Sequence, residues 1–196
     1  MHYLIFFFCF SIFGCKEKTS FESMNYSKLH DEAKNYCETN NFETDYYILI
    51  DMSIHSGRNR FFVYNFKIQK NDFEKLITHG SCDVFEENPT LWEKAKFGSK
   101  VDSHYSMKGK YSTGKRDYSK WGIHVKYWLN GLEKSNANSI ERVTVLHSWE
   151  AIAYHEVFPD FAPLSWGCPA FSNEFMTILD VKLQMSTKPV LLWIID

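Results

Sequence analysis

Short runs of β-branched and aromatic residues, separated by turn-forming residues, repeat along the chain from residue 46 to its end. Side chains of these types pack well on a pleated sheet, and clusters of Gly, Asn and Ser favour turns between strands. Aromatic residues make up 17% of the chain, which fits sheet surfaces better than a helical bundle. We therefore expect an α+β fold that is mainly β. The expected strands span residues 46–53, 60–68, 75–82, 108–114, 122–130, 142–149 and 189–196.

Length and charge limit the number of domains and the class of partner. The chain has 196 residues, which is enough for one well-packed domain and short for two. Its 22 Lys and Arg are balanced by 24 Asp and Glu, and like charges do not gather in long runs. This distribution lacks the basic surface that binds a phosphate backbone. We expect one domain and no nucleic-acid partner, and no pattern indicates an oligomeric state.

The first residues have the pattern of an export signal. Residues 1–13, MHYLIFFFCFSIF, are apolar over a stretch too short for a transmembrane helix, as in the central region of a signal peptide. The Gly-Cys pair that ends at Cys15 is followed by polar residues, and it resembles the lipobox of bacterial lipoproteins, with Cys15 as the lipid-modified residue. Plain secretion and an uncleaved anchor are the alternatives. We expect an exported envelope protein attached to a membrane through Cys15, with the division 1–15 signal peptide, 16–44 stalk or helix and 45–196 main domain.

Two short helices are expected outside the strands. Residues 21–40 carry apolar side chains at helical spacing among polar neighbours, which predicts an amphipathic helix that serves as a packing element or a stalk. Near the end of the chain, Ser172 and Glu174 supply a capping residue and a first-turn acid before the amphipathic stretch FMTILDVKLQM. A helix that begins after Ser172 places Cys168 on the turn leading into it.

The cysteine count leaves at least one free thiol in the exported protein. If Cys9 leaves with the signal and Cys15 carries lipid, the remaining cysteines are Cys37, Cys82 and Cys168. Three cysteines form at most one disulfide, and a free thiol in an oxidising compartment needs an explanation. Cys37 and Cys82 are one potential pair, which leaves Cys168 free. A buried, inert cysteine is the alternative to a reactive one.

His147 and Cys168 form the strongest chemical signal in the sequence. His147 ends a β-branched run, and Ser148 after it can orient the ring. Cys168 follows Gly167 on a turn 21 residues after His147. A cysteine attacks as the thiolate, and a neighbouring imidazole that takes its proton is the usual way to form one at neutral pH. Gly167 allows a sharp turn whose amides, that of Cys168 included, can face a developing oxyanion.

These residues resemble the signature of the L,D-transpeptidase family, in which His-Gly or His-Ser precedes Ser-x-Gly-Cys. Here the motif reads His147-Ser148 and Ser165-Trp166-Gly167-Cys168. The resemblance covers residues 46–196 and implies an L,D-transpeptidase-like β-sandwich or barrel, with a short N-terminal helix and one helix after the cysteine. The murein L,D-transpeptidase catalytic-domain subgroup also has counterparts of the stretch GLEKSNAN at 131–138, of His79-Gly80, and of Ser103, Ser106, Gly109 and Tyr111.

The resemblance implies a catalytic order. Cys168 is the nucleophile, His147 is first the general base and then the acid, and the backbone at Ser148 or Trp166 steadies the imidazole. The implied partner is a peptidoglycan stem tetrapeptide. The thiolate attacks the carbonyl of the L-centre of its third residue and releases the terminal D-Ala, and an amine of another stem resolves the thioester into a 3-3 cross-link.

Other residues follow from the resemblance alone. The amides of Gly167 and Cys168 form the oxyanion hole, with Ser165 in support. Tyr111, Trp166 and His79 are expected at the substrate. No metal and no organic cofactor is needed. Trp166 and the Pro-Ala pair after Cys168 differ from the residues that many members carry, so the polar contact to the donor peptide is left unassigned.

Two other functions stay open. Water in place of the acceptor amine makes the chain an L,D-carboxypeptidase or peptidase, and a degenerate site makes it a non-catalytic peptidoglycan-binding lipoprotein. Retention of both Cys168 and His147 argues against the second. Zinc binding is disfavoured because the histidines lack partners at ligand spacing, namely His79, His104, His124, His147 and His155. Four tryptophans line a cleft or pack in the core, namely Trp92, Trp121, Trp128 and Trp149.

Overall fold

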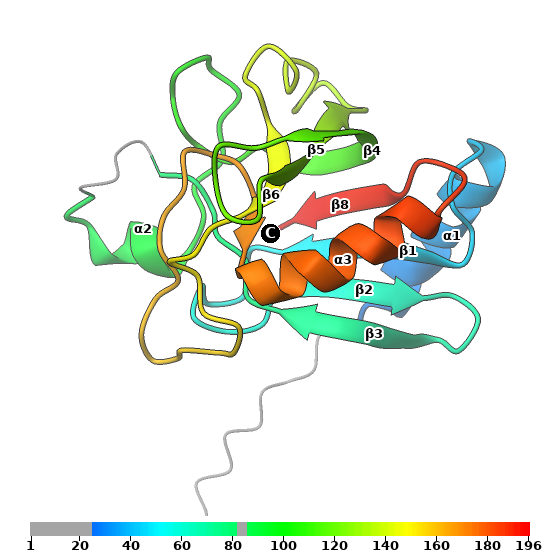
Figure 1. The fold of residues 1–196 in the computed structure, drawn as a ribbon, viewed down its shortest axis with the longest axis horizontal. Coiled ribbons are helices and arrows are strands. Elements are labelled where there is room, and N and C mark those ends of the chain that lie inside the picture. Colours follow the sequence, from blue (N-terminus) through cyan, green and yellow to red (C-terminus); the bar gives the residue numbers. More distant parts are fainter. Residues whose placement is uncertain (1–24, 82–85) are drawn as a thin grey trace, which may run out of the picture.

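The computed structural model describes residues 25–81 and 86–196, which form one curved sheet with helices around it (Figure 1). Within these residues the strands are β1 (Tyr46–Asp51), β2 (Phe61–Asn65), β3 (Lys70–Lys75), β4 (Gly109–Tyr118), β5 (Val125–Gly131), β6 (Val145–Ser148), β7 (Ala170–Phe171) and β8 (Leu191–Ile195). The helices are α1 (Ser27–Thr39), α2 (Pro89–Glu93) and α3 (Asn173–Met185).

The sheet has the order β3-β2-β1-β8-β4-β5-β6-β7 and curls until its two edges approach each other. Its parallel pairs are β1 with β8 and β6 with β7, and the other neighbours are antiparallel. The segment after β3 reaches β7, because Thr78 N donates to Ala170 O at 3.1 Å and Ala170 N donates to Thr78 Oγ1 at 3.1 Å. The result is a nearly closed barrel, which confirms the expected mainly β, α+β fold.

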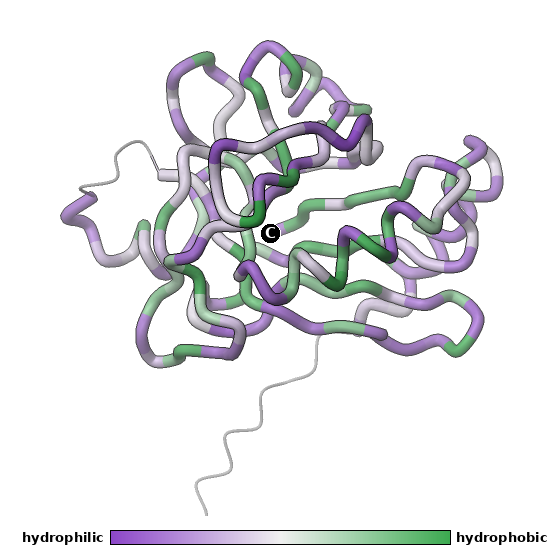
Figure 2. The backbone as a smooth tube through the Cα atoms, viewed as in Figure 1, coloured by the Kyte–Doolittle hydropathy of each residue, from purple (hydrophilic) through white to green (hydrophobic). Residues whose placement is uncertain are grey.

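Two apolar clusters lie on opposite faces of the central strand β1. Tyr46, Ile48 and Ile50 belong to the cluster that α3 covers, and Tyr47 and Leu49 belong to the cluster under α1. Side chains alternate between the faces of a strand, so a strand covered on both faces is apolar throughout. The central strands are accordingly among the most hydrophobic parts of the chain (Figure 2).

The helix at the end of the chain begins where its capping residue predicts. Ser172 is the N-cap of α3, and its hydroxyl accepts a hydrogen bond from Phe175 N at 3.2 Å. This bond satisfies an amide that lacks a partner within the helix. Phe175, Met176 and Leu179 then bury one face of α3 against the sheet. The helix anchors the segment that carries Cys168.

The N-terminal helix is a packing element, which is one of the two roles expected for it. Ala33 and Cys37 of α1 are buried in the cluster on its side of the sheet. Cys37 carries a free thiol, so the structure does not show the potential bond to Cys82. Cys82 itself lies outside the described residues, as do the predicted signal segment and Cys15. No helix in the described ranges is long and apolar enough to span a bilayer.

The strand expected at 75–82 is wrong in position. The ladder strand is β3, which ends at Lys75, and Leu76, Ile77 and Thr78 follow it as buried chain. Their apolar character comes from closing the barrel against β7, and that long-range contact leaves no local pattern. The two-residue strand β7 and the short helix α2 are also too short to give a periodic signal.

Candidate active site

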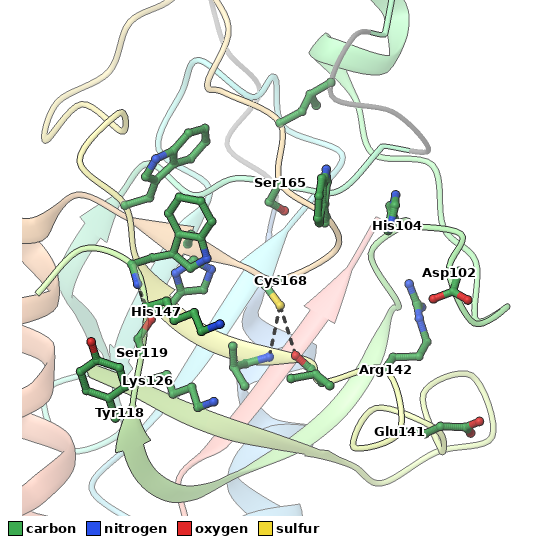
Figure 3. A pocket seen from close by; sticks show the side chains of 18 of the residues that line it. Asp102, His104, Tyr118, Ser119, Lys126, Glu141, Arg142, His147, Ser165 and Cys168 are labelled. Atoms are coloured by element: carbon green, nitrogen blue, oxygen red, sulfur yellow. Dashed lines mark hydrogen bonds between the residues drawn. The ribbon is translucent and has the colours of Figure 1, made fainter. Parts of the chain in front are cut away.

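A surface pocket of about 780 Å³ lies over strands β5, β6 and β7 and brings together the two residues of the strongest motif. His147 and Cys168 both line it, and Figure 3 shows them with their neighbours. Polar and charged side chains that share the pocket include Ser165, Lys126 and Arg142. The candidate site is therefore accessible from solvent and built on the sheet.

Strand pairing brings Cys168 and His147 to the same pocket. The parallel strands β6 and β7 pair His147 with Ala170, and His147 N donates to Pro169 O at 3.3 Å. Cys168 lies two residues before Ala170, so its side chain points to the same face of the sheet. On that face the sulfur accepts a hydrogen bond from Val145 N at 3.5 Å. Residues that are 21 positions apart in the sequence thus meet through a two-residue strand.

The turn before Cys168 requires glycine. Gly167 has a φ of +102°, and a Cβ there would lie 3.0 Å from Tyr105 O. Ser106 clamps the same turn, because its hydroxyl donates to Gly167 O at 3.3 Å and accepts from Gly80 N at 2.9 Å. Gly80 also forms a bridge with Ser165. These contacts from Ser106 and Gly80 fix the turn that precedes Cys168.

The His147 ring is held by the backbone of its neighbour. Its Nδ1 lies 2.9 Å from Ser148 O, an acceptor, so Nδ1 carries the proton and Nε2 is the basic nitrogen. The Ser148 hydroxyl is used elsewhere, because it accepts a hydrogen bond from Ile123 N at 3.0 Å. Burial lowers the pKa of His147, and the Lys126 charge lowers it further. The hydrogen bond to Ser148 opposes these two effects, and the net lowering favours the neutral imidazole, which can act as a base.

The surroundings of Cys168 favour its thiol form. Burial raises its pKa, while the Val145 amide and the charges of Arg142 and Lys126 act in the opposite direction. The sulfur lies 3.5 Å from Val143 O, to which the thiol donates. Within the described residues no hydrogen bond joins Cys168 to His147. Burial therefore favours the neutral form of both side chains.

The two amides expected to form an oxyanion hole differ in their availability. Gly167 N donates to the Ser165 hydroxyl at 3.2 Å, so this amide is already engaged. Ser165 thus supports the turn through its side chain, and its own amide donates to His79 O at 2.9 Å. For the Cys168 amide the described part of the chain offers no acceptor. The geometry favours Cys168 N alone as the donor to an oxyanion.

Tyr111 and His79, which are expected at the substrate, are not among the residues that line the pocket. Tyr111 is fully buried, and its hydroxyl donates to Met107 O at 2.7 Å. His79 is buried with its Nδ1 2.7 Å from an Arg60 nitrogen and its Nε2 2.7 Å from Leu91 O. The buried Arg60 donates, so His79 is neutral and bridges Arg60 to the α2 segment. Both residues support the barrel interior.

Trp166 does line the pocket. Its indole is 63% exposed and stacks on the His104 ring, with the ring centroids 4.9 Å apart. Trp121 and Trp149 also line the pocket, and their rings meet edge to face at 6.3 Å. Aromatic faces at a pocket rim suit the apolar parts of peptides and sugars.

Arg142 and Lys126 are pocket residues that the sequence analysis missed. Arg142 donates to Gly98 O and to Tyr105 O, both at 2.8 Å, and so ties the loop before β4 to the segment before β6. Lys126 lies on β5 directly opposite His147. The alternation of residues along β5 predicts that Lys126 is a polar residue on one face of the sheet. That it lies next to His147 follows only from the pairing of β5 with β6. Across the described ranges, no group of three or more His, Cys, Asp or Glu residues is placed to hold a metal ion.

Comparisons with known proteins give a family and distant structural neighbours. A family model for the L,D-transpeptidase catalytic domain matches residues 20–192. A search of curated proteins finds no match.

Among solved structures, the chain is similar to an L,D-transpeptidase from Xylanimonas cellulosilytica DSM 15894, at 12% identity and a TM-score of 0.44 over 76% of this chain and 59% of that one. It is also similar to the helical cell shape determining protein Pgp2 from Campylobacter jejuni, at 14% identity and a TM-score of 0.45 over 76% and 48% of the two chains. Bd1075 from Bdellovibrio bacteriovorus matches at 17% identity and a TM-score of 0.45 over 80% and 50%. The chain thus spans about half the length of these proteins.

Proposed function

The chain belongs to the L,D-transpeptidase catalytic domain family, and we propose that it is a cysteine acyltransferase that cross-links peptidoglycan stem peptides. The observation that carries the proposal is the pairing of β6 with β7, which presents Cys168 and the basic Nε2 of His147 on one face of the same pocket. A nucleophile next to an oriented base is the arrangement that covalent acyl transfer requires.

The first step forms the bond to sulfur. The carbonyl of the third stem residue enters above Cys168, and the thiol exchanges its hydrogen bond to Val143 O for one to His147 Nε2. Sγ bonds to the carbonyl carbon as its proton moves to Nε2. The oxygen gains the negative charge and accepts a hydrogen bond from the Cys168 amide. Proton transfer at the moment of attack suits a pair whose resting forms are both neutral.

The next steps release the leaving group and pass on the acyl group. The carbon–nitrogen bond breaks, His147 gives its proton to the departing amine of D-Ala, and a thioester remains on Cys168. The amine of a second stem then attacks the thioester carbon, loses its proton to His147 and forms the new amide. The proton returns to sulfur, so the thiol is regenerated and no cofactor takes part.

We propose that the protein acts in the cell envelope and is attached to a membrane through lipid on Cys15. The support is the apolar segment before Cys15 and the polar segment after it. Metabolic labelling with a fatty acid tests the attachment. Label on the wild-type chain that is lost from C15A supports the anchor, and an unlabelled wild type contradicts it.

Product analysis with a defined donor tests the acyl transfer. The chain is incubated with disaccharide tetrapeptide, and products are separated and weighed by mass spectrometry. Cross-linked dimers, absent with C168A, support transpeptidation. Tripeptides without dimers indicate that water resolves the thioester and that the protein is an L,D-carboxypeptidase. Unchanged donor with a folded wild type indicates a binding protein.

A further inference from the structure

Lys126 lines the pocket and brings a positive charge to it. Within the described residues it forms no ion pair. Its ammonium lies 4.7 Å from the centre of the Trp128 ring. Asp117 pairs with Lys126 across β4 and β5, and the hydrogen bond from Trp128 and the Lys126 charge both help to lower the pKa of Asp117. The Asp117 carboxylate accepts its hydrogen bonds from Trp128 Nε1 at 3.1 Å and from Tyr118 N at 2.8 Å, so it does not occupy the Lys126 ammonium as an ion-pair partner. A lysine held over an aromatic ring at a pocket wall remains free to bind an anion.

The sheet places Lys126, His147 and Cys168 in a fixed lateral order. Lys126 pairs with His147, and His147 pairs with Ala170, so these three positions share one face of neighbouring strands. Adjacent strands are about 4.8 Å apart. Cys168 precedes Ala170 on the same face. Across the sheet from β7 to β5, the strand positions therefore run from the side of Cys168 and Ala170 to His147 and then to Lys126.

This order matches the order of groups in a donor peptide that ends in a free carboxylate. The carbonyl must reach Cys168, and the nitrogen that leaves must reach His147. One Cα separates that nitrogen from the carboxylate carbon when the leaving group is a single amino acid, which puts them about 2.5 Å apart. Because the carboxylate lies this close to the leaving nitrogen, a cation that binds the carboxylate must lie near His147. Lys126 meets this condition, since it pairs with His147 from the neighbouring strand β5.

Other cations of the pocket do not fit that position. Arg142 lies on the opposite side of Cys168 from His147 and Lys126 (Figure 3), and its guanidinium is bound to the carbonyls of Gly98 and Tyr105. Lys120 lines the pocket too, but its side chain is exposed on the loop after β4.

We propose that Lys126 binds the terminal carboxylate of the departing amino acid and so selects donors that end one residue after the cleaved bond. The inference rests on the proposed acyl transfer and adds a specificity residue to it. A charge-assisted hydrogen bond to a carboxylate changes a rate constant by about tenfold to a hundredfold. A donor whose carboxylate is masked or moved one residue further loses this contact.

The test compares two donors that differ only at the carboxylate. Release of the last residue is measured as kcat/KM for a stem tetrapeptide and for the same peptide with a C-terminal amide. Each is assayed with the wild type, K126M, K126R and K126Q, with K120M at the exposed lysine of the pocket lining, and with K115M as a control for an exposed lysine of β4 outside the pocket. The ratio of the two rates within one variant cancels any change in Cys168 reactivity.

We expect the wild type and K115M to favour the free carboxylate by about tenfold or more. K126M and K126Q bring the ratio close to one, and K126R restores part of it because the charge is kept. An unchanged ratio in K126M and K126Q, or its loss in K120M instead, overturns the inference. A wild type that processes neither donor contradicts the proposed function itself.

Discussion

The thiol of Cys168 donates to the carbonyl oxygen of Val143 at 3.5 Å, and not to the imidazole of His147. His147 Nδ1 donates a hydrogen bond to Ser148 O, so Nε2 is the basic nitrogen of the ring. Both side chains line the same pocket, and burial favours the neutral form of each. In the proposed mechanism, charge develops on the two side chains only as the sulfur attacks the substrate carbonyl.

A thiol that is protonated in the free protein predicts that alkylation of Cys168 has its midpoint at a higher pH than that of an ordinary cysteine. Because burial raises the pKa of Cys168, its reaction with iodoacetamide should rise with pH and reach half its maximum above the ordinary thiol value of about 8.5. Digestion and mass spectrometry report alkylation of the Cys168 peptide separately from other cysteines. A free cysteine peptide serves as the reference. A midpoint for Cys168 below that of the reference contradicts the neutral resting pair.

Removal of the base should slow donor cleavage but leave alkylation of Cys168 at high pH nearly unchanged. H147Q is expected to lower the rate of donor cleavage by about 10² to 10⁴, the usual contribution of a general base. Alkylation of Cys168 at pH 10 should stay close to the wild-type rate, because hydroxide removes the proton there. H155Q, at a histidine outside the pocket lining, is the matched control and should cleave donor normally. Normal cleavage by H147Q would exclude His147 as the base.

The backbone at Val143 stores strain next to the nucleophile. Val143 is an exposed β-branched residue with a φ of 53°, a conformation that costs about 1–2 kcal/mol for an L-residue. V143G should raise the free energy of unfolding by about 0.5–1 kcal/mol, because glycine recovers part of this cost and loses some to chain entropy. Urea denaturation measures the change.

Val101 provides the comparison for that substitution. It is another exposed valine of the pocket lining, and its φ is not positive. V101G should therefore leave stability unchanged or lower it. Equal losses of stability in V143G and V101G would show that the Val143 backbone is not strained.

Asp180 connects α3 to the sheet and should make stability depend on pH. Its carboxylate accepts from Arg116 Nε at 2.8 Å, from Arg116 NH2 at 2.9 Å and from the Tyr127 hydroxyl at 2.6 Å. The hydrogen bonds from Arg116 hold the pKa of Asp180 below its ordinary value. A lowered folded-state pKa adds stability above the unfolded-state pKa, about 3.9, and that stability is lost as the pH falls through the folded-state pKa.

D180N should then cost about 1–2 kcal/mol at pH 7, a figure reduced for the solvent-exposed Arg116. The difference from the wild type should shrink as the pH falls below about 4. Urea denaturation at both pH values measures it, with E150Q as an exposed control. A difference that stays constant from pH 7 to pH 3 would contradict the role assigned to Asp180.

Local patterns in the sequence predict the elements whose contacts are local or repeated. Alternating and apolar runs locate β1, β2, β4, β5, β6 and β8, and the cap at Ser172 locates the start of α3. The apolar run after Lys75 misleads because its burial comes from barrel closure against β7. No periodicity within that run distinguishes a ladder strand from buried connecting chain.

Local sequence patterns likewise predict some residues of the candidate site, whereas others depend on long-range contacts. The motif identifies Cys168 and His147, and the pairing of β6 with β7 brings both to the same pocket. Lys126 and Arg142 enter the pocket through strand pairing and loop packing, which depend on residues far away in the chain. Long-range packing also explains why His79 and Tyr111 are buried, since both are enclosed when the sheet curls.

The acyl-enzyme tests the central claim most directly. The protein is mixed with disaccharide tetrapeptide and quenched in acid, and the digest is weighed by mass spectrometry. The Cys168 peptide is predicted to gain the mass of the donor less one D-Ala, with free D-Ala in the supernatant, and C168A should show neither. Donor cleavage by C168A, or D-Ala release with the adduct on another residue, would contradict the account.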